Sequence, residues 1–181
     1  DTLQEFLDVL HMDSLDLLQD QCGKFYRLHS RDNPQSQFRL ANSLWLDQRT
    51  KFEPQFLDTA RESFYADLFQ ADFTDPDLGK DMGSWISKNT EGLLAPDIQT
   101  DPENQRLALL NTIYYRAPWR DEFYEKNNTQ EEFTKKHGST VECTFLNCSW
   151  GTGAGYQGDG FRRASLPLSE QGSLLGEMIF V

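Results

Sequence analysis

The stretch that decides the fold is Leu107-Ala108-Leu109-Leu110-Asn111-Thr112-Ile113-Tyr114-Tyr115. Its side chains are apolar at odd and even positions alike, and only Asn111 and Thr112 break the pattern. Successive side chains of a strand point to opposite faces, so a strand with two apolar faces is typical of the middle of a sheet covered on both sides. The sequence therefore predicts a central strand over residues 107–115, with a polar pair inside it.

An upstream strand also carries an amide in an apolar row. Residues 38–46 alternate, and every second residue from Phe38 to Leu46 is apolar except Asn42. A buried amide costs roughly 1 to 3 kcal/mol unless its hydrogen bonds are made. Two interpretations are open for Asn42 and Asn111. They are structural amides with satisfied hydrogen bonds, or they form a polar pin that holds two strands together and can release them.

Helices are predicted on either side of this upstream strand. Apolar residues recur at helical spacing from Leu3 to Leu10, and Ser14 stands as the N-cap of a second helix that ends before Pro34. Pro54 occupies the first position of a third helix. A short alternating piece at residues 69–73 then leads to a fourth helix that stops near Gly92.

The rest of the chain is rich in strands. We expect them over Glu132–Thr134, Thr140–Asn147, Phe161–Leu168 and Leu174–Val181. The glycine-rich run at residues 151–158 is expected to be a flexible loop between strands. Helices followed by a strand-rich second half predict an α+β fold.

Composition limits the class of protein. The chain has 181 residues, the size of one domain or two small ones, and 13% of them are aromatic, enough to build a modest core. Its 29 acidic and 17 basic side chains leave a net charge of -12, which argues against nucleic acid because binding phosphates takes clustered Lys and Arg. No stretch reaches the roughly 18 consecutive apolar residues of a membrane span, so we expect no membrane partner.

Motifs for enzymatic chemistry are weak. Residues 153–158 match G-x-G-x-x-G, and Glu177 lies about where a ribose-binding acid would be, but the following residues predict a strand that ends at Pro167 instead of a helix. No G-x-S-x-G elbow is present. We therefore expect no enzyme and no cofactor, and an enzyme that uses the glycine-rich run is the weakest hypothesis.

Metal-binding patterns are weak as well. The histidines are scattered, the cysteines form no C-x-x-C pair, and the aspartates at 72, 75 and 77 lack the glycine and glutamate of an EF-hand. We expect free or buried thiols, a solvated acidic turn and no metal site. The residues concerned are His11, His29, His137, Cys22, Cys143 and Cys148.

Four motifs, in order and spacing, resemble the serpin family and cover nearly the whole chain. They are Phe38–Trp45; Trp85-Ile86 with Thr90-Glu91-Gly92; Leu109–Tyr115 followed by Trp119 and Phe123; and Leu166-Pro167-Leu168 with Met178–Val181. The resemblance implies a serpin-like α+β fold, in which helices pack on a large mixed β-sheet, sheet A, beside parts of sheets B and C.

The resemblance also implies a role for each element of one partial serpin domain over residues 1–181. The first helices are similar to helices C and D, with residues 14–29 as helix D; residues 38–46 resemble strand 2A, 54–65 helix E, 69–73 strand 1A, 80–89 helix F, and 107–115 strand 3A, before strands of sheets C and B. Strand 3A is the strand that parts from strand 5A when the reactive loop inserts. Asn111, Thr112 and Asn42 then fall in the shutter region of the sheet, and Trp119 falls in the breach.

Three positions depart from the family pattern. Ala117-Pro118 replaces the glycine before the breach tryptophan, Gly83 replaces an asparagine of helix F, and Leu93 replaces a lysine. Each departure is expected to affect how the sheet opens. Pro118 in particular removes a backbone hydrogen-bond donor near the breach.

The resemblance implies an incomplete domain. Serpin domains are roughly twice this length. The helices that open such a domain before helix C, strand 5A, the reactive-centre loop and the last strands of sheets B and C have no counterpart here. The apolar run that reaches Val181 agrees with an internal piece of a serpin. We expect such a piece to be poorly folded by itself.

The function implied for the parent protein is suicide inhibition of serine proteases, with cysteine proteases as a second target class. The chain by itself lacks the reactive loop and is expected not to inhibit. The alternative is a non-inhibitory serpin that acts as a binding or carrier protein. We expect a secreted protein that is a monomer at full length; the triplets Asn127-Asn128-Thr129 and Asn147-Cys148-Ser149 permit glycosylation in a eukaryotic secretory pathway.

Overall fold

The computed structural model describes residues 2–148 and 154–181, which form two compact units. The first unit comprises Gln37–Tyr115 and the residues up to Asn33. The second comprises Pro34–Ser36 and Arg116–Val181. In the described part of the chain, no helix is both long and apolar enough to cross a membrane.

The predicted helices of the first unit are confirmed. Ser14 caps the second helix, since its Oγ accepts a hydrogen bond from the Leu17 N–H at 3.2 Å, and Pro54 opens the third. The third helix ends at Glu62, three residues earlier than predicted, because Phe64 and Tyr65 turn into the next strand. The four helices are α1 (Thr2–Leu10), α2 (Leu15–His29), α3 (Pro54–Glu62) and α4 (Leu78–Asn89).

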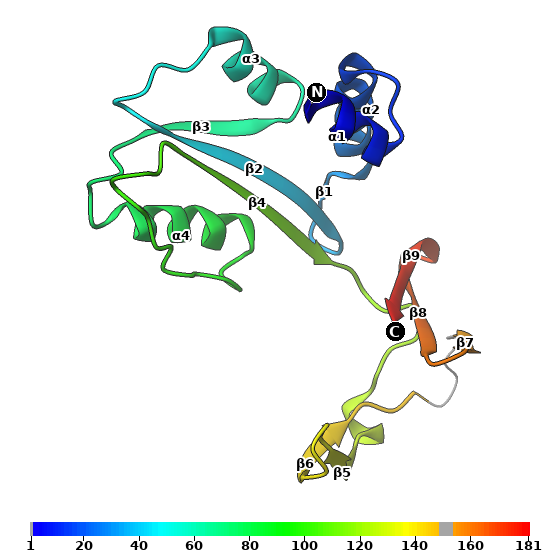
Figure 1. Cartoon of the computed structure of the whole chain (residues 1–181). Coiled ribbons are helices and arrows are strands. Elements are labelled where there is room, and N and C mark those ends of the chain that lie inside the picture. Colours follow the sequence, from blue (N-terminus) through cyan, green and yellow to red (C-terminus); the bar gives the residue numbers. More distant parts are fainter. Residues whose placement is uncertain (1, 149–153) are drawn as a thin grey trace. The chain divides into compact units, whose positions relative to one another are not determined.

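The sheet of the first unit is built around β2 (Gln37–Asp47). The strand β3 (Ala66–Ala71) runs parallel to β2, with Asn42 opposite Ala66. On the other side β2 pairs with β4 (Leu107–Arg116) (Figure 1). The short β1 (Arg31–Asp32) pairs antiparallel with the first two residues of β2. The Asp47 N–H donates to the Arg106 carbonyl at 3.0 Å while Asn42 meets Asn111, so β2 and β4 are antiparallel.

Helices cover both faces of β2. The indole of Trp45 packs with Met82, Trp85 and Ile86 of α4, whereas Leu44 and Leu46 pack with Ala60 of α3. Neighbouring strand residues point to opposite faces, so α4 and α3 lie on opposite sides of the sheet, as Figure 1 shows. The unit is therefore a three-layer arrangement of helix, sheet and helix around β2.

The predicted strand at 107–115 is confirmed as β4, but within the described residues only one of its two apolar faces is covered. Ala108 is buried in the α4 core, whereas Leu109 and Ile113 on the other face are 66% and 63% exposed. Within the described residues β4 has one strand neighbour, β2. The order of residues shows which faces of a strand are apolar, but whether a face is buried depends on the segments that pack against it.

The second unit is made of strands, as predicted. A hairpin joins β5 (Thr129–Thr134) to β6 (Thr140–Phe145) after the short 3-10 helix η1 (Glu125–Asn127). A three-stranded antiparallel sheet contains β7 (Ala154–Gln157), β8 (Arg162–Glu170) and β9 (Ser173–Phe180).

The flexible loop expected over residues 151–158 is partly wrong. Residues 151–153 lie outside the described residues, but Ala154–Gln157 forms strand β7, with Tyr156 opposite Arg163 of β8. The ring centroids of Tyr156 and Phe161 are 5.9 Å apart across the turn. Small residues accept extended backbone readily, and the edge of β8 offers hydrogen-bond partners, so the run becomes a strand in spite of its glycines.

Candidate functional site

The predicted amides Asn42 and Asn111 meet across neighbouring strands. The Asn111 Nδ2 donates a hydrogen bond to the Asn42 Oδ1 at 2.8 Å, with a longer contact of 3.5 Å to the Ala41 carbonyl. The Asn42 Nδ2 in turn donates to the Phe64 carbonyl at 2.8 Å. Both ends of the half-buried Asn42 amide are therefore used, and the side chains link β4, β2 and the turn before β3.

This pair is a mechanical link between strands and has no catalytic groups. Both amides are neutral, so separating them leaves no unpaired charge, and a hydrogen bond of this kind contributes about 0.5 to 1.5 kcal/mol net. A contribution of that size holds strands in register but is small enough to be broken. The geometry suits a structural amide and a releasable pin equally well.

Thr112 lies on the opposite face of β4 from Asn111. It is 7% exposed, and among the described residues its Oγ1 has no hydrogen-bond partner. A buried hydroxyl without a partner costs about 1 to 3 kcal/mol. Among the described residues, β4 is therefore tied to β2 by Asn111 on one face and carries a hydroxyl without a partner on the other.

Trp119 belongs to the second unit, whereas the other three predicted site residues belong to the first. Trp119 is half-buried, forms an isolated bridge with Leu168 of β8 and stacks edge-on with Phe123, with ring centroids 6.0 Å apart. The carbonyl of the neighbouring Pro118 accepts a hydrogen bond from the Ser169 N–H at 3.1 Å. Pro118 thus lacks a donor, but its carbonyl is engaged by β8.

An ion pair between the buried Asp47 and the exposed Arg49, at the end of β2, was not predicted. The Asp47 carboxylate is 1% exposed and contacts Arg49, with Nη2 at 2.6 Å and Nε at 2.9 Å, while Arg106 Nη1 lies 3.6 Å away. The hydrogen bonds from Arg49 lower the pKa of Asp47 to about 2, although burial acts in the opposite direction. Arg49 also donates to the Pro102 carbonyl at 3.1 Å, so this pair fastens the segment before β4 to β2.

The segment that follows α4 lies directly against that helix. A Cβ atom added to Gly79 would lie 2.0 Å from the Ile98 carbonyl oxygen, and one added to Gly83 would lie 2.1 Å from that of Pro96. Gly83, one of the three departures from the family pattern, therefore allows this close approach. Leu93, another departure, is 74% exposed.

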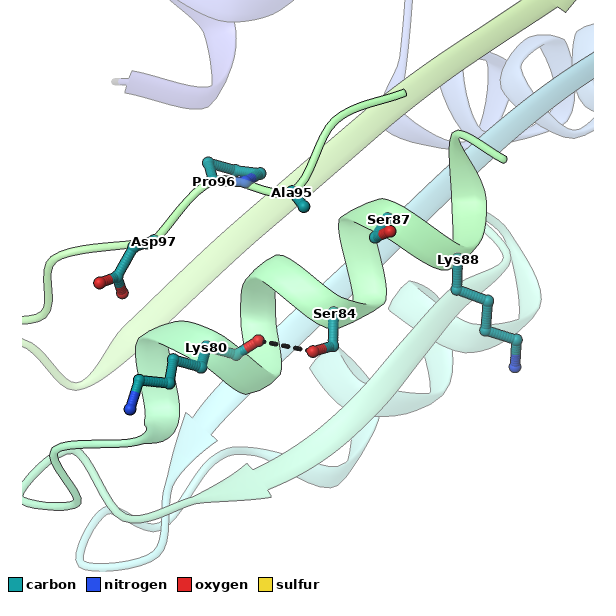
Figure 2. A pocket seen from close by; sticks show the side chains of 7 residues that line it. All are labelled: Lys80, Ser84, Ser87, Lys88, Ala95, Pro96 and Asp97. Carbon is teal, nitrogen blue, oxygen red and sulfur yellow. Dashed lines mark hydrogen bonds between the residues drawn. The ribbon is translucent and has the colours of Figure 1, made fainter. Parts of the chain in front are cut away.

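Figure 2 shows the groove between α4 and residues 95–97. Lys80 and Lys88 lie at the two ends of the helical wall, and the Ser84 hydroxyl donates to the Lys80 carbonyl at 2.8 Å. The Lys80 ammonium lies 2.7 Å from Asp77, whose hydrogen bond raises the pKa of Lys80. The charged groups do not converge on a common point, so the groove does not form a binding site of its own.

The described residues do not bring the weak metal and nucleotide motifs together into a site. In residues 2–148 and 154–181 no three His, Cys, Asp or Glu side chains are placed to hold a metal ion. All three cysteines are free and half-buried. The described part of the G-x-G-x-x-G run is a strand followed by another strand, and Ser149 of the second glycosylation triplet lies outside the described residues.

The sequence is similar to those of known protease inhibitors. The family model described as "Serpin (serine protease inhibitor)" matches residues 1–180. Alpha-1-antiproteinase S of Cavia porcellus is 30% identical over 122 residues, which are 66% of this chain and 30% of that protein. Human Serpin I2 is 28% identical over 135 residues, or 73% of this chain and 33% of that protein. The chain thus spans about a third of the length of these curated relatives.

Solved structures give the same result for the fold. Arabidopsis AtSerpin1 in its native stressed conformation matches with a TM-score of 0.79 and 25% identity, over 92% of this chain and 44% of that chain. The thermophilic serpin tengpin in its latent state matches with a TM-score of 0.74 and 21% identity, over 96% and 50%. With helices packed on a mixed sheet and a family match over almost every residue, the chain belongs to the serpin family.

Proposed function

We propose that the protein containing these residues is a suicide inhibitor of serine proteases, with cysteine proteases as a second target class. The target's nucleophile attacks the scissile carbonyl of the reactive loop, the peptide bond breaks, the new amino end leaves, and an acyl-enzyme ester or thioester remains. The cleaved loop then enters the sheet as an added strand and carries the protease with it. Strand addition of this kind is the known mode of serpin loop insertion, and family membership is the reason for proposing it here.

The observation that supports the proposal is the link between Asn42 and Asn111 beside an open strand edge. Among the described residues β4 pairs with β2 alone, so its other edge presents backbone donors and acceptors to a further strand. The Asn111 side chain holds β4 to β2 while that other edge changes partner. Asn42 and Asn111 thus act as the shutter pin in this proposal.

Thr112 and Trp119 have different roles in the proposal. The partnerless Thr112 hydroxyl lowers the stability of the closed sheet and contributes to a metastable native state. Trp119 marks the breach, where loop insertion begins. We assign α2 to helix D, β2 to strand 2A, α3 to helix E, β3 to strand 1A, α4 to helix F and β4 to strand 3A, followed by strands of sheets C and B in a single serpin domain.

The proposal describes a secreted, monomeric protein that is no enzyme and needs no cofactor. The 181 residues by themselves are not an inhibitor, because they hold no counterpart of the reactive loop. The protease is the partner, and its identity is set by the scissile bond of that loop.

A second candidate is a non-inhibitory serpin that acts as a binding or carrier protein. It is favoured by Pro118, whose carbonyl is tied to Ser169 of β8 next to Trp119. A breach held in this way resists the opening that loop insertion requires. This alternative predicts that cleavage of the loop brings no large rise in melting temperature.

The deciding experiment incubates the full-length protein with a panel of serine and cysteine proteases. Inhibition predicts a covalent complex that survives SDS gels, together with a large rise in melting temperature once the loop is cleaved. Protein whose loop was cleaved beforehand is the matched control and forms no complex. Cleavage of every sample without a complex and without a rise in melting temperature supports the carrier function instead.

A further inference from the structure

Tyr65 occupies an unusual backbone conformation between α3 and β3. Its φ is +53°, in the left-handed region that side chains other than glycine rarely adopt. Two contacts from α2 hold it: the Tyr26 ring stacks on the Tyr65 ring with centroids 4.2 Å apart and planes at 7°, and the Arg27 Nη1 donates to the Tyr65 Oη at 2.7 Å. Helix α2 therefore clamps this residue by its ring and by its hydroxyl.

The carbonyl next to Tyr65 orients the Asn42 amide. The Phe64 oxygen accepts from the Asn42 Nδ2 at 2.8 Å, which leaves the Asn42 Oδ1 to accept from Asn111. An amide has a donor end and an acceptor end. If the Phe64 carbonyl moved away, the Asn42 amide would be free to rotate and to turn its donor end toward the donor of Asn111.

The clamp is a discrete contact and is not part of dense packing. A pocket of about 400 Å³ lies between α2, β2 and the turn, and Tyr26, Tyr65, Asn42 and Asn111 all line it. Side chains around such a space transmit little force through packing, because contacts are lost where partner atoms are absent. Among the described residues, a displacement of α2 therefore reaches the turn chiefly through Tyr65.

We propose that Tyr65 is a positioning residue for the shutter pin: its clamp to α2 fixes the Phe64 carbonyl, and through it the orientation of Asn42 toward Asn111. The strength of the tie between β2 and β4 then depends on how α2 is seated. That this coupling controls opening of the sheet rests on the proposed function, whereas the coupling itself does not.

Hydrogen–deuterium exchange of the full-length protein tests the coupling. Tyr65→Phe removes the hydroxyl alone, Tyr65→Ala removes the ring, and Tyr65→Gly removes the ring while relieving the backbone. We expect exchange of the β4 amides at 109–113 to rise about threefold in the first variant and about tenfold in the others, the range expected for a lost hydrogen bond or ring contact. Lys24→Gln on the exposed side of α2, where Lys24 pairs with Asp20 at 2.6 Å, is the matched control and leaves β4 unchanged.

A merely structural role gives a different pattern. Faster exchange confined to α2 and the 63–65 turn, with β4 unaffected, overturns the proposal. Because the coupling runs through Asn42, Tyr65→Ala adds nothing to β4 exchange in an Asn42→Ala background, and an independent further rise also overturns it. Arg27→Ala is expected to act like Tyr65→Phe, with Arg27→Lys restoring slow exchange.

The outcomes for Tyr65 and for protease inhibition are separable. The exchange experiment uses no protease, so coupling without a covalent complex retains the role of Tyr65 and rejects the proposed function. A covalent complex without coupling does the reverse. If Tyr65→Ala does not fold, Tyr65→Phe still decides the result.

Discussion

Asp47 and Arg49, two residues apart at the end of β2, form a bidentate ion pair in which the carboxylate is buried and the guanidinium is exposed: Nη2 lies 2.6 Å from Oδ2 and Nε lies 2.9 Å from Oδ1. The pair also reaches the segment before β4, because Arg49 donates to the Pro102 carbonyl and Arg106 lies beside the same carboxylate. The ends of two neighbouring strands thus meet at a single carboxylate. We therefore expect the charge of that carboxylate to stabilise this end of the sheet.

Acid should loosen this end of the sheet. The pKa of Asp47 falls from 3.8 to about 2 on folding, so its stabilising contribution is complete above about pH 5 and is lost progressively as the pH falls toward and below 2. Thermal melts of the full-length protein between pH 7 and pH 2 should show this loss. Asp47→Asn should melt lower at pH 7 and depend less steeply on pH below 4. The exposed Asp13→Asn is the control and should keep the wild-type steepness.

The amide pair predicts a coupled loss of stability. Asn111→Ala should lower the free energy of unfolding by about 0.5 to 1.5 kcal/mol, and Asn42→Ala by about 1 to 3 kcal/mol because it strands both the Phe64 carbonyl and the Asn111 amide. The double variant should lose less than the sum in urea denaturation. Asn147→Ala, whose side chain bonds to Asn127 and Thr129 in the second unit, should add fully to Asn42→Ala. Full additivity between Asn42 and Asn111 would contradict the link.

Gly83→Ala should reverse the usual sign of a glycine substitution in a helix. Replacing a helical glycine by alanine ordinarily stabilises by roughly 0.5 to 1 kcal/mol. Here the added Cβ meets the Pro96 carbonyl oxygen at 2.1 Å, so we expect a loss of about 1 to 3 kcal/mol in the same urea assay. Gly155→Ala, which has open space around its Cβ position, should change stability by less than about 0.5 kcal/mol. A stabilised Gly83→Ala protein would show that residues 96–98 do not lie against α4.

Thr112→Val should stabilise the protein. Valine keeps the shape of threonine and removes the buried hydroxyl that has no partner among the described residues, a gain of about 1 to 3 kcal/mol in the free energy of unfolding. The exposed Thr140→Val on β6 is the control, with a change within about 0.5 kcal/mol. If the proposed function holds, the same variant should also inhibit more slowly, since a more stable closed sheet opens less readily. A destabilised Thr112→Val protein would mean that the hydroxyl makes a favourable contact.

Local chemistry explains which parts of the fold could be predicted. Ser14 caps α2, Pro54 opens α3 and Gly92 takes a positive φ after α4, because each of these roles depends on a residue and its near neighbours. The strand predicted at 107–115 could be identified for the same reason, and the structure extends it by one residue to Arg116. The burial of this strand could not be predicted, since covering Leu109 and Ile113 depends on other segments.

The candidate site was predicted only in part. Asn42 and Asn111 were identified as amides in apolar rows, and they do meet. The Phe64 carbonyl that orients Asn42 is a backbone group, and no sequence pattern indicates a tyrosine at positive φ. Neither feature could therefore be predicted from the sequence. Arg49 lies close to Asp47 in sequence, but an acid and a base near the end of a strand are too common to indicate an ion pair with a buried carboxylate.

For the 181 residues by themselves, the unpaired edge of β4 has a consequence for solubility. An unpaired edge beside the exposed Leu109 and Ile113 is the arrangement from which edge-to-edge aggregation starts, because any extended chain can complete its hydrogen bonds. Within the described residues α4 covers the Ala108 face of the stretch from Leu107 to Tyr115, but no proline lies in the stretch and no strand pairs with its second edge. The backbone groups that would receive a reactive loop are therefore also the groups on which a second copy of these 181 residues would pair. We expect the piece by itself to aggregate through this edge.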